Sequence, residues 1–480
     1  MVQKFLRVMV TSTYDDINLL TTTSPRLTAE ERLFQHVNKT TLLVQLKSAL
    51  SPVKELPFEI LSAIFSHCIT GTSKLPLQRS SVPWNLTHVS STWRAVALQV
   101  PNLWNDISIS FSSDRPQEFT RITNMLEAFL SRTNKTPISL EILAEHIQSS
   151  PLNPPDALCH SIENIVRPYA GRLRHLFLRP PDQFKALFGH PQHALEVLES
   201  VSLNIANLAV GFDAITAGIM IPGDAHNLRK ITISTESASL DLHSLQFPWA
   251  GLTELRILNT VVTYTGCHAA LRQCPNLVTF TLGMVPEDRT CLDQIPSTRL
   301  RHLKSLTIMA RYADGNYGLF LRPFILWSLK EFTITGGPWA EWLGISSLIA
   351  RSSCRLERFE AVEFHTPETL EFLLKVPSLT KLSLRQCSQN YAISSLDDLT
   401  ISDSTVYDRD LLPNLRGIEC NLDDVKPLIY LLELRSQSVA VTSIQSWTIH
   451  GDPEKARQII GKSTHKFARE MDIIYKGVTT

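Results

Sequence analysis

The stretch LTKLSLRQC, Leu379–Cys387, places apolar residues at its first, fourth and sixth positions, with Ser and charged or polar residues around them. The pattern, Leu-x-x-Φ-x-Φ with Φ apolar, recurs along the longer part of the chain at a mean interval of about 27 residues. A period of about 20–50 residues is typical of proteins built from stacked repeats, each of which buries its apolar face against its neighbours. The first position of the pattern falls at Leu173, Leu198, Leu228, Leu252, Leu277, Leu303, Leu329, Leu356, Leu379, Leu415 and Ile444.

The two Φ positions predict a short strand in each repeat, because side chains two positions apart point to the same face of a strand. The positions between them are mostly charged or hydroxylated, as at Lys230, Glu254 and Thr307. We therefore expect every strand to have one buried and one solvent-facing side. The expected buried residues are Leu176, Leu178, Val201, Leu203, Ile231, Ile233, Leu255, Ile257, Phe280, Leu282, Leu306, Ile308, Phe332, Ile334, Phe359, Ala361, Leu382, Leu384, Ile418, Cys420, Trp447 and Ile449.

Helical stretches lie between the predicted strands. GCHAALRQC, SSLIARSSC and PETLEFLLKV have helical character, and pairs such as Pro275-Asn276 then turn the chain into the next strand. One strand and one helix per repeat predict an α/β solenoid over residues 166–450, with parallel strands inside and helices outside. The longest interval, between Leu379 and Leu415, indicates an inserted loop.

The rest of the chain shows other patterns. Residues 1–27 are rich in Thr and Ser and poorly patterned, which predicts disorder, whereas residues 28–50 begin with the capping box TAEE and predict a helix. Residues 110–165 are interpreted as a connecting segment. Residues 451–480 begin with GDPEKARQII, whose Asp and Pro suit the N-cap and first helical position, and they predict a C-terminal capping helix and tail.

Residues 53–109 contain three apolar segments. LPFEILSAIFSHCI, which starts at Leu56, predicts a short helix with a wide apolar stripe. WNLTHVSSTWRAVALQ, which starts at Trp84, predicts a second helix that Pro101 ends, and an apolar Leu-Trp pair follows. A unit of about 50 residues is at the margin of independent stability. We therefore expect these apolar faces to dock on the rest of the chain or on another protein.

The succession of LP-x-E-I-L-x-x-I-F, V-S-x-x-W-R and L-W over residues 53–109 resembles an F-box, a small all-helical domain. Together with repeats that match the leucine-rich-repeat signature, the chain resembles F-box/leucine-rich-repeat proteins of the type expanded in filamentous fungi. The loop at residues 70–83 is longer than is usual in that family. The resemblance implies a non-catalytic substrate-recognition subunit of a Skp–cullin–F-box-type ubiquitin ligase, bound to a Skp-type adaptor and through it to a cullin. The adaptor contacts that it implies are Leu56, Pro57, Ile60, Leu61, Ile64, Phe65, Val89, Trp93, Leu103 and Trp104.

The solvent-facing side of the strands is the expected binding site for a target protein, since solenoids bind partners on their concave surface. Its charges are of both signs, which favours a protein ligand over a phosphate backbone. A merely solvated face, without a partner, is an equally weighted alternative. The predicted contact residues are Lys230, Arg256, Arg358, Glu360, Lys381 and Arg385.

Composition excludes several classes of function. The 46 Lys and Arg residues balance 46 Asp and Glu residues, which argues against nucleic-acid binding. The sequence contains no run of about 18 apolar residues, so it predicts no membrane span. The eight cysteines form no CxxC motif, which indicates free thiols in a reducing compartment, the cytoplasm or the nucleus. The sequence contains no Gly-rich phosphate loop, GxSxG or HExxH motif, so we expect no cofactor and no metal.

Two alternatives remain open from the sequence. In one, the chain is a leucine-rich-repeat binding scaffold unconnected with ubiquitin, and the F-box-like helices form an N-terminal cap on the repeats. In the other, which is the least favoured, the chain is an enzyme whose His, Asp or Cys residues gather on the concave face from distant repeats.

Overall fold

The chain divides into two compact units that alternate along the sequence. The first contains Met1–Ser108 and Glu127–Thr136, and the second contains Ile109–Leu126 and Pro137–Thr480. The computed structural model describes residues 10–13, 15, 17, 29–49, 56–69, 71–77, 81–112, 115–145, 156–181, 184, 187, 195–205, 221, 225–235, 239–240, 242, 245–283, 295–309, 317–335, 342–362, 372–373, 375–385, 412–421, 444–450, 452, 454–455 and 472–476.

The first unit is built mainly from helices. Its elements are α2 (Ala29–Ala49), α3 (Phe58–His67), β1 (Ser73–Leu75), α4 (Val82–Val89), α5 (Ser91–Gln99) and the 3-10 helix η2 (Pro101–Leu103). Helix α2 falls within the predicted range. Most of the N-terminal segment predicted to be disordered lies outside the described residues, and residues 10–13 are helical.

The single helix predicted to begin at Trp84 is wrong, because the chain forms two helices that meet at Ser90. The backbone of Ser90 is extended, with φ −159° and ψ 167°, so the helix cannot continue through it. The Ser90 hydroxyl accepts a hydrogen bond from the Trp93 backbone N–H at 3.1 Å, which caps α5. Ser is a preferred N-cap residue because its side chain pairs one of the free N–H groups at a helix start.

A long parallel sheet runs through the second unit, and its strands are neighbours in the order in which they occur in the chain. Two further pairs of short strands are parallel as well: β7 (Ser239–Leu240) with β9 (Val261–Val262), and β11 (Thr298–Arg299) with β13 (Phe324–Ile325). From β2 onward, the order of strands in the sheet is β2 (Asp106–Ser112), β3 (Ile138–Glu145), β4 (Leu173–Arg179), β5 (Ser200–Ile205), β6 (Lys230–Thr235), β8 (Glu254–Leu258), β10 (Thr279–Leu282), β12 (Ser305–Met309), β14 (Glu331–Thr335), β15 (Arg358–Val362), β16 (Lys381–Arg385), β17 (Gly417–Asn421), β18 (Ser446–His450) and β19 (Asp472–Lys476).

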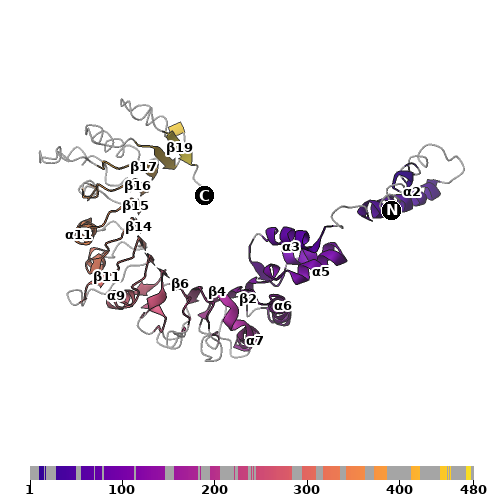
Figure 1. The fold of residues 1–480 in the computed structure, drawn as a ribbon, viewed down its shortest axis with the longest axis horizontal. Helices are drawn as coiled ribbons and strands as arrows, with labels where there is room; N and C mark the ends of the chain where they lie inside the picture. The colour runs from indigo at the N-terminus through magenta and orange to yellow at the C-terminus, as the bar shows by residue number, and fades with distance from the viewer. Residues whose placement is uncertain are drawn as a thin grey trace. The chain divides into compact units, whose positions relative to one another are not determined.

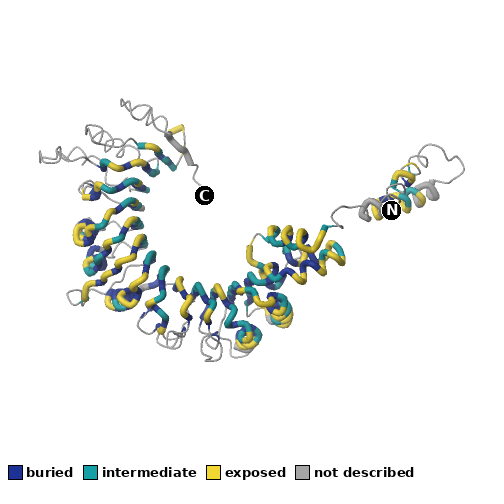
Figure 2. The backbone as a smooth tube through the Cα atoms, in the orientation of Figure 1, coloured by how far each residue is buried: buried dark blue, intermediate teal, exposed yellow. Residues whose placement is uncertain are grey.

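The register of the sheet confirms the predicted repeat. Phe332 of β14 pairs with Phe359, which pairs with Leu382, and the column continues through Ile418 to Trp447. Every residue of the predicted buried set is buried except Leu384, which is half-buried. Buried and exposed positions alternate along the strands (Figure 2), as expected for a sheet with one covered side.

Helices cover the apolar side of the sheet. Within the second unit, the strands follow one another along an arc, and α9 and α11 lie on its outer side (Figure 1). The α/β solenoid with parallel strands inside and helices outside is therefore confirmed. The helical elements of this unit are η3 (Pro116–Glu118), α7 (Asp156–Val166), η4 (Arg167–Arg172), η7 (Trp249–Gly251), α9 (Tyr264–Arg272), α10 (Tyr317–Leu321) and α11 (Trp342–Ser352), and α6 (Phe119–Arg132) spans the boundary between the units.

In several repeats the residue before the leading Leu links neighbouring repeats. The Asn276 side-chain amide donates to the Ala250 backbone oxygen at 3.0 Å, and the Asn414 amide donates to the Pro377 oxygen at the same distance. The Ser378 hydroxyl donates likewise to the Leu356 oxygen at 2.8 Å. These bonds satisfy backbone carbonyls at the turn that leads into a strand. The polar turns seen in the sequence therefore hold consecutive repeats in register.

The sheet extends beyond both predicted boundaries. Strands β2 and β3 precede residue 166 and belong to the long sheet, so the segment predicted as a connection contributes strands to it. Strand β19 follows residue 450, where a capping helix is predicted. Glu454 and Lys455 are helical, and the rest of that predicted helix lies outside the described residues. The inserted loop between Leu379 and Leu415 lies largely outside them as well.

Candidate functional site

Helices α3 and α4 expose apolar side chains to solvent. On α3, Ile60 and Ile64 lie one turn apart and are exposed, and Phe58 at the start of the helix is exposed too. On α4, Trp84 and Val89 are exposed. Exposed large apolar residues on short helices are typical of a protein interaction site. We call these five residues the apolar helix face.

Four of the predicted adaptor contacts belong to the core of the first unit instead. Leu61, Phe65, Leu103 and Trp104 are almost fully buried, which corrects the prediction that they contact an adaptor. The sequence could not separate these roles, because neighbouring apolar residues on a short helix point to adjacent sides. The remaining predicted contacts are accessible: Ile60, Ile64, Val89 and Pro57 are exposed, and Leu56 and Trp93 are half-buried.

Trp104 has a complete set of partners inside the first unit. Its indole N–H donates to the Ala97 backbone oxygen at 2.9 Å. Its ring meets Phe129 edge-on, with centroids 4.8 Å apart, and the Arg132 guanidinium lies 4.5 Å from the ring centroid. Phe129 and Arg132 come from Glu127–Thr136, outside the predicted F-box range of residues 53–109. The helical unit therefore needs this later segment to cover Trp104.

The solvent-facing residues of the strands form an inner strand face, which corresponds to the predicted concave surface. One ion-pair cluster lies on β6 and β8. Lys230 Nζ lies 3.1 Å from Glu254 Oε2, and Arg256 Nε lies 2.6 Å from Glu254 Oε1. Lys230 and Glu254 are partners in the register of the sheet, so the parallel pairing itself brings them together.

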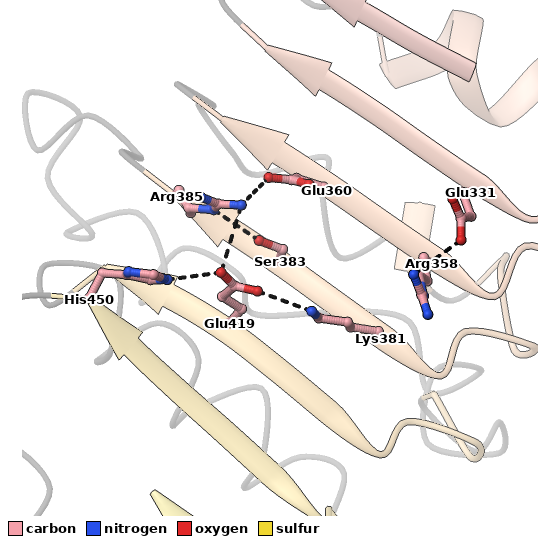
Figure 3. A network of polar contacts seen from close by, with 8 residues as sticks. All are labelled: Glu331, Arg358, Glu360, Lys381, Ser383, Arg385, Glu419 and His450. Atoms are coloured by element: carbon pink, nitrogen blue, oxygen red, sulfur yellow. Dashed lines mark hydrogen bonds and ion pairs between the residues drawn. The ribbon is translucent and has the colours of Figure 1, made fainter. Parts of the chain in front are cut away.

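A second cluster lies on β15–β18, where Glu419 sits between three positively charged or donor groups (Figure 3). Lys381 Nζ lies 3.2 Å from Glu419 Oε2, and His450 Nε2 lies 2.8 Å from Glu419 Oε1. Arg385 Nη2 lies 3.7 Å from the same Oε1, and it also binds Glu360. Nearby, Arg358 Nη1 lies 3.2 Å from Oε1 of Glu331.

These partners hold the carboxylates in their charged form. Burial by itself raises the pKa of Glu419, but hydrogen bonds from His450 and Lys381 and the positive charge of Arg385 outweigh it, so the pKa lies below its ordinary value. The pKa of Glu254 is lowered in the same way, because Lys230 and Arg256 outweigh its burial. Both glutamates are therefore anionic at neutral pH.

The sequence prediction included five cations of the inner strand face and one of their partners, Glu360, but not the other partners. All six predicted contact residues lie on this face, and each is in an ion pair. Glu254, Glu331, Glu419 and His450 complete the two clusters. Their signal in the sequence is an opposite charge at the same repeat position, or two residues on, in an adjacent repeat.

Outside these clusters, the strongly perturbed groups are enclosed in the core. Burial lowers the pKa of His268 to about 4 and raises the pKa of Cys274 to about 12. The pKa of the neighbouring Cys267 thiol is raised as well, by burial and by Cys274. Among the described residues, no group of three or more His, Cys, Asp or Glu residues is placed to hold a metal ion. Within the same residues, no helix combines the length and apolar character needed to cross a bilayer.

Comparisons with known proteins leave the family open. No protein-family model matches the chain, and no curated protein matches it. Among solved structures, it is similar to the crystal structure of a Bacteroides fragilis protein determined by the Northeast Structural Genomics Consortium. The identity is 11%, the TM-score is 0.30, and the similarity covers 56% of this chain and 73% of that one. A similarity at this level carries no argument about function.

Proposed function

We propose that the chain is a substrate-recognition subunit of a Skp–cullin–F-box-type ubiquitin ligase. In this role, the first unit docks on a Skp-type adaptor, and the repeats hold a target protein within reach of the ligase. The chain forms no bond itself, because proximity alone raises the effective concentration of the target.

The observation that carries this proposal is the apolar helix face. Ile60 and Ile64 are part of the F-box-like LP-x-E-I-L-x-x-I-F segment, and the fold leaves both exposed although Leu61 and Phe65 beside them are buried. Trp93 supports Phe65 from α5, with ring centroids 5.0 Å apart. Helix α3 thus has a core side and a free side, as a docking helix requires.

Capture of a recombinant Skp-type adaptor by the purified chain tests this proposal. Ile60→Ser together with Ile64→Ser should reduce capture at least tenfold, because interface anchors contribute about 2 kcal/mol or more when truncated. Both side chains are exposed, so the variant should unfold like the wild type. Val44→Ser, which alters an exposed apolar residue on α2, is the matched control and should leave capture unchanged. Absence of capture by the wild type, or equal capture by all three proteins, would contradict the proposal.

A binding scaffold without a link to ubiquitin is the second candidate. It is favoured by the alternation of the two units along the chain, since Glu127–Thr136 belongs to the helical unit but lies between two segments of the solenoid unit. A helical unit interleaved in this way fits a cap that folds with the repeats. This candidate predicts no adaptor capture, so the same experiment separates the two functions.

A further inference from the structure

The cations of the first cluster are more exposed to solvent than the carboxylate that they neutralise. The Glu254 side chain is 17% exposed, whereas Lys230 is 61% and Arg256 is 50% exposed. A partner that approaches β6 and β8 therefore meets ammonium and guanidinium groups before it meets the carboxylate. The cluster has a positive outer layer, although a negative charge lies beneath it.

The second cluster repeats this arrangement. Glu419 is 14% exposed beneath Lys381, which is 50% exposed. Arg358 is 63% exposed and its partner Glu331 is 43% exposed. Arg385 is the exception, because its exposure is about that of Glu360. Four cations thus project from the inner strand face: Lys230, Arg256, Arg358 and Lys381.

The projecting cations keep donors for a second acceptor. An ammonium carries three N–H donors and a guanidinium carries five, so a contact with one carboxylate does not exhaust them. Guanidinium and ammonium groups bind carboxylates through charge-assisted hydrogen bonds. The ion pairs with the less exposed glutamates orient the cations and limit their rotamers, which lowers the entropy lost when a ligand binds.

The four cations form two pairs separated by a strip that carries no cation at its inner-face positions on β10, β12 and β14. Lys230 and Arg256 lie on β6 and β8, and Arg358 and Lys381 are register partners on β15 and β16. From β8 to β15 there are four strand steps of about 4.8 Å, or about 19 Å. An extended chain covers that distance in about six residues. The hydroxyl residues of the strip are Thr279, Thr281, Ser305, Thr307 and Thr333.

We infer that the inner strand face from β6 to β16 binds an acidic segment of a partner protein, whose two acidic groups lie about six residues apart. The inference rests on the proposed function only in that the repeats bind the target. A peptide fits better than a polynucleotide, because an evenly charged phosphate backbone would cross the strip without cations and lie over Glu331 and the other glutamates. The hydroxyl groups of the strip can instead bond to a peptide backbone.

The test uses the full chain and a fluorescein-labelled peptide, Glu-Glu-(Gly-Ser)3-Glu-Glu, with binding followed by fluorescence anisotropy at about 150 mM NaCl. The wild type should bind the peptide. Lys230→Gln with Arg256→Gln, and Arg358→Gln with Lys381→Gln, should each weaken binding roughly threefold to tenfold, since each exposed charge pair contributes about 0.2–1 kcal/mol. Thermal unfolding of each variant checks that it remains folded.

The matched control is Arg174→Gln with Lys330→Gln. These cations are about half exposed, and each forms an ion pair with a glutamate, Glu199 or Glu357. Each stands one residue before a position of the inner strand face, His175 or Glu331, so neither is one of the positions that form that face. The control should bind the peptide as tightly as the wild type. Equal weakening in the control would mean general charge attraction and would overturn the inference.

Three other results would overturn it. One is the absence of peptide binding, and another is equal or tighter binding of the same peptide with Lys in place of Glu. The third is a single-stranded thymidine oligonucleotide that binds more tightly than the peptide and loses affinity in the same variants, which would assign the face to polynucleotides. The assay contains no adaptor, so failure here together with adaptor capture that depends on Ile60 and Ile64 would leave the proposed function standing.

Discussion

Stability of the solenoid should fall in mild acid because of one buried histidine, His268 on α9. Its Nδ1 lies 2.8 Å from the Thr298 hydroxyl, and its Nε2 lies 3.1 Å from the Phe320 backbone oxygen. The carbonyl can only accept, so Nε2 carries the proton and Nδ1 accepts from the hydroxyl. Phe320 and Phe324 surround the ring, with centroids 5.1 and 4.6 Å away. The neutral imidazole therefore ties three repeats together.

The size of the effect follows from the pKa. Burial is the main cause that lowers the pKa of His268 from 6.5 to about 4. Between these values the unfolded chain binds a proton that the folded chain does not, so stability falls as the pH falls. With about 1.36 kcal/mol per unit of pKa difference, the free energy of unfolding decreases by about 2 kcal/mol at pH 5 and by about 3 kcal/mol once the pH is below 4.

Urea unfolding at pH 7.5 and pH 5.0 measures this loss, with His268→Gln as the comparison. Glutamine keeps an N–H donor for the Phe320 oxygen but does not titrate. The variant is expected to be less stable than the wild type at pH 7.5, and the difference between the two proteins should narrow by about 2 kcal/mol at pH 5.0. All other titrating groups are shared and cancel in the difference. A gap of the same size at both pH values would refute the reasoning.

Three further predictions concern packing and charge. Trp104→Phe should lower the free energy of unfolding by about 2–3 kcal/mol, because it removes the indole hydrogen bond to the Ala97 oxygen and creates a cavity. The exposed Trp84→Phe should lower it by less than about 0.5 kcal/mol in the same urea experiment. Glu419→Gln should lower the free energy of unfolding by about 1–2 kcal/mol at pH 7. Because the pKa of Glu419 is lowered, the difference between variant and wild type should vanish as the pH falls through that pKa. A loss of stability that is independent of pH would contradict the role of the charge. Gly344→Ala should destabilise by about 2–3 kcal/mol or more, because an added Cβ would lie 2.2 Å from the Gly318 Cα, and an unchanged melting temperature would disprove this close helix contact.

The repeat could be read directly from the sequence because its information is local. An apolar residue at every second strand position and a leading Leu in each repeat determine which side chains face inward, whatever the neighbouring repeat is. The pairing of buried residues across neighbouring strands, from Leu176 to Trp447, follows from this alternation. The two earlier strands escaped detection because β2 and β3 alternate apolar residues without the leading Leu of the pattern.

Which apolar side chains of the first unit are core and which are surface was decided only by tertiary structure. Leu61 and Ile60 are adjacent and chemically alike, and only the packing of α3 against α5 buries one and exposes the other. Likewise, the cations of the inner strand face could be predicted from the sequence, but their partners depend on the stacking of residues that lie about 24–38 positions apart in the chain. Such contacts arise when parallel strands align, and the alignment is a property of the assembled sheet rather than of any one segment.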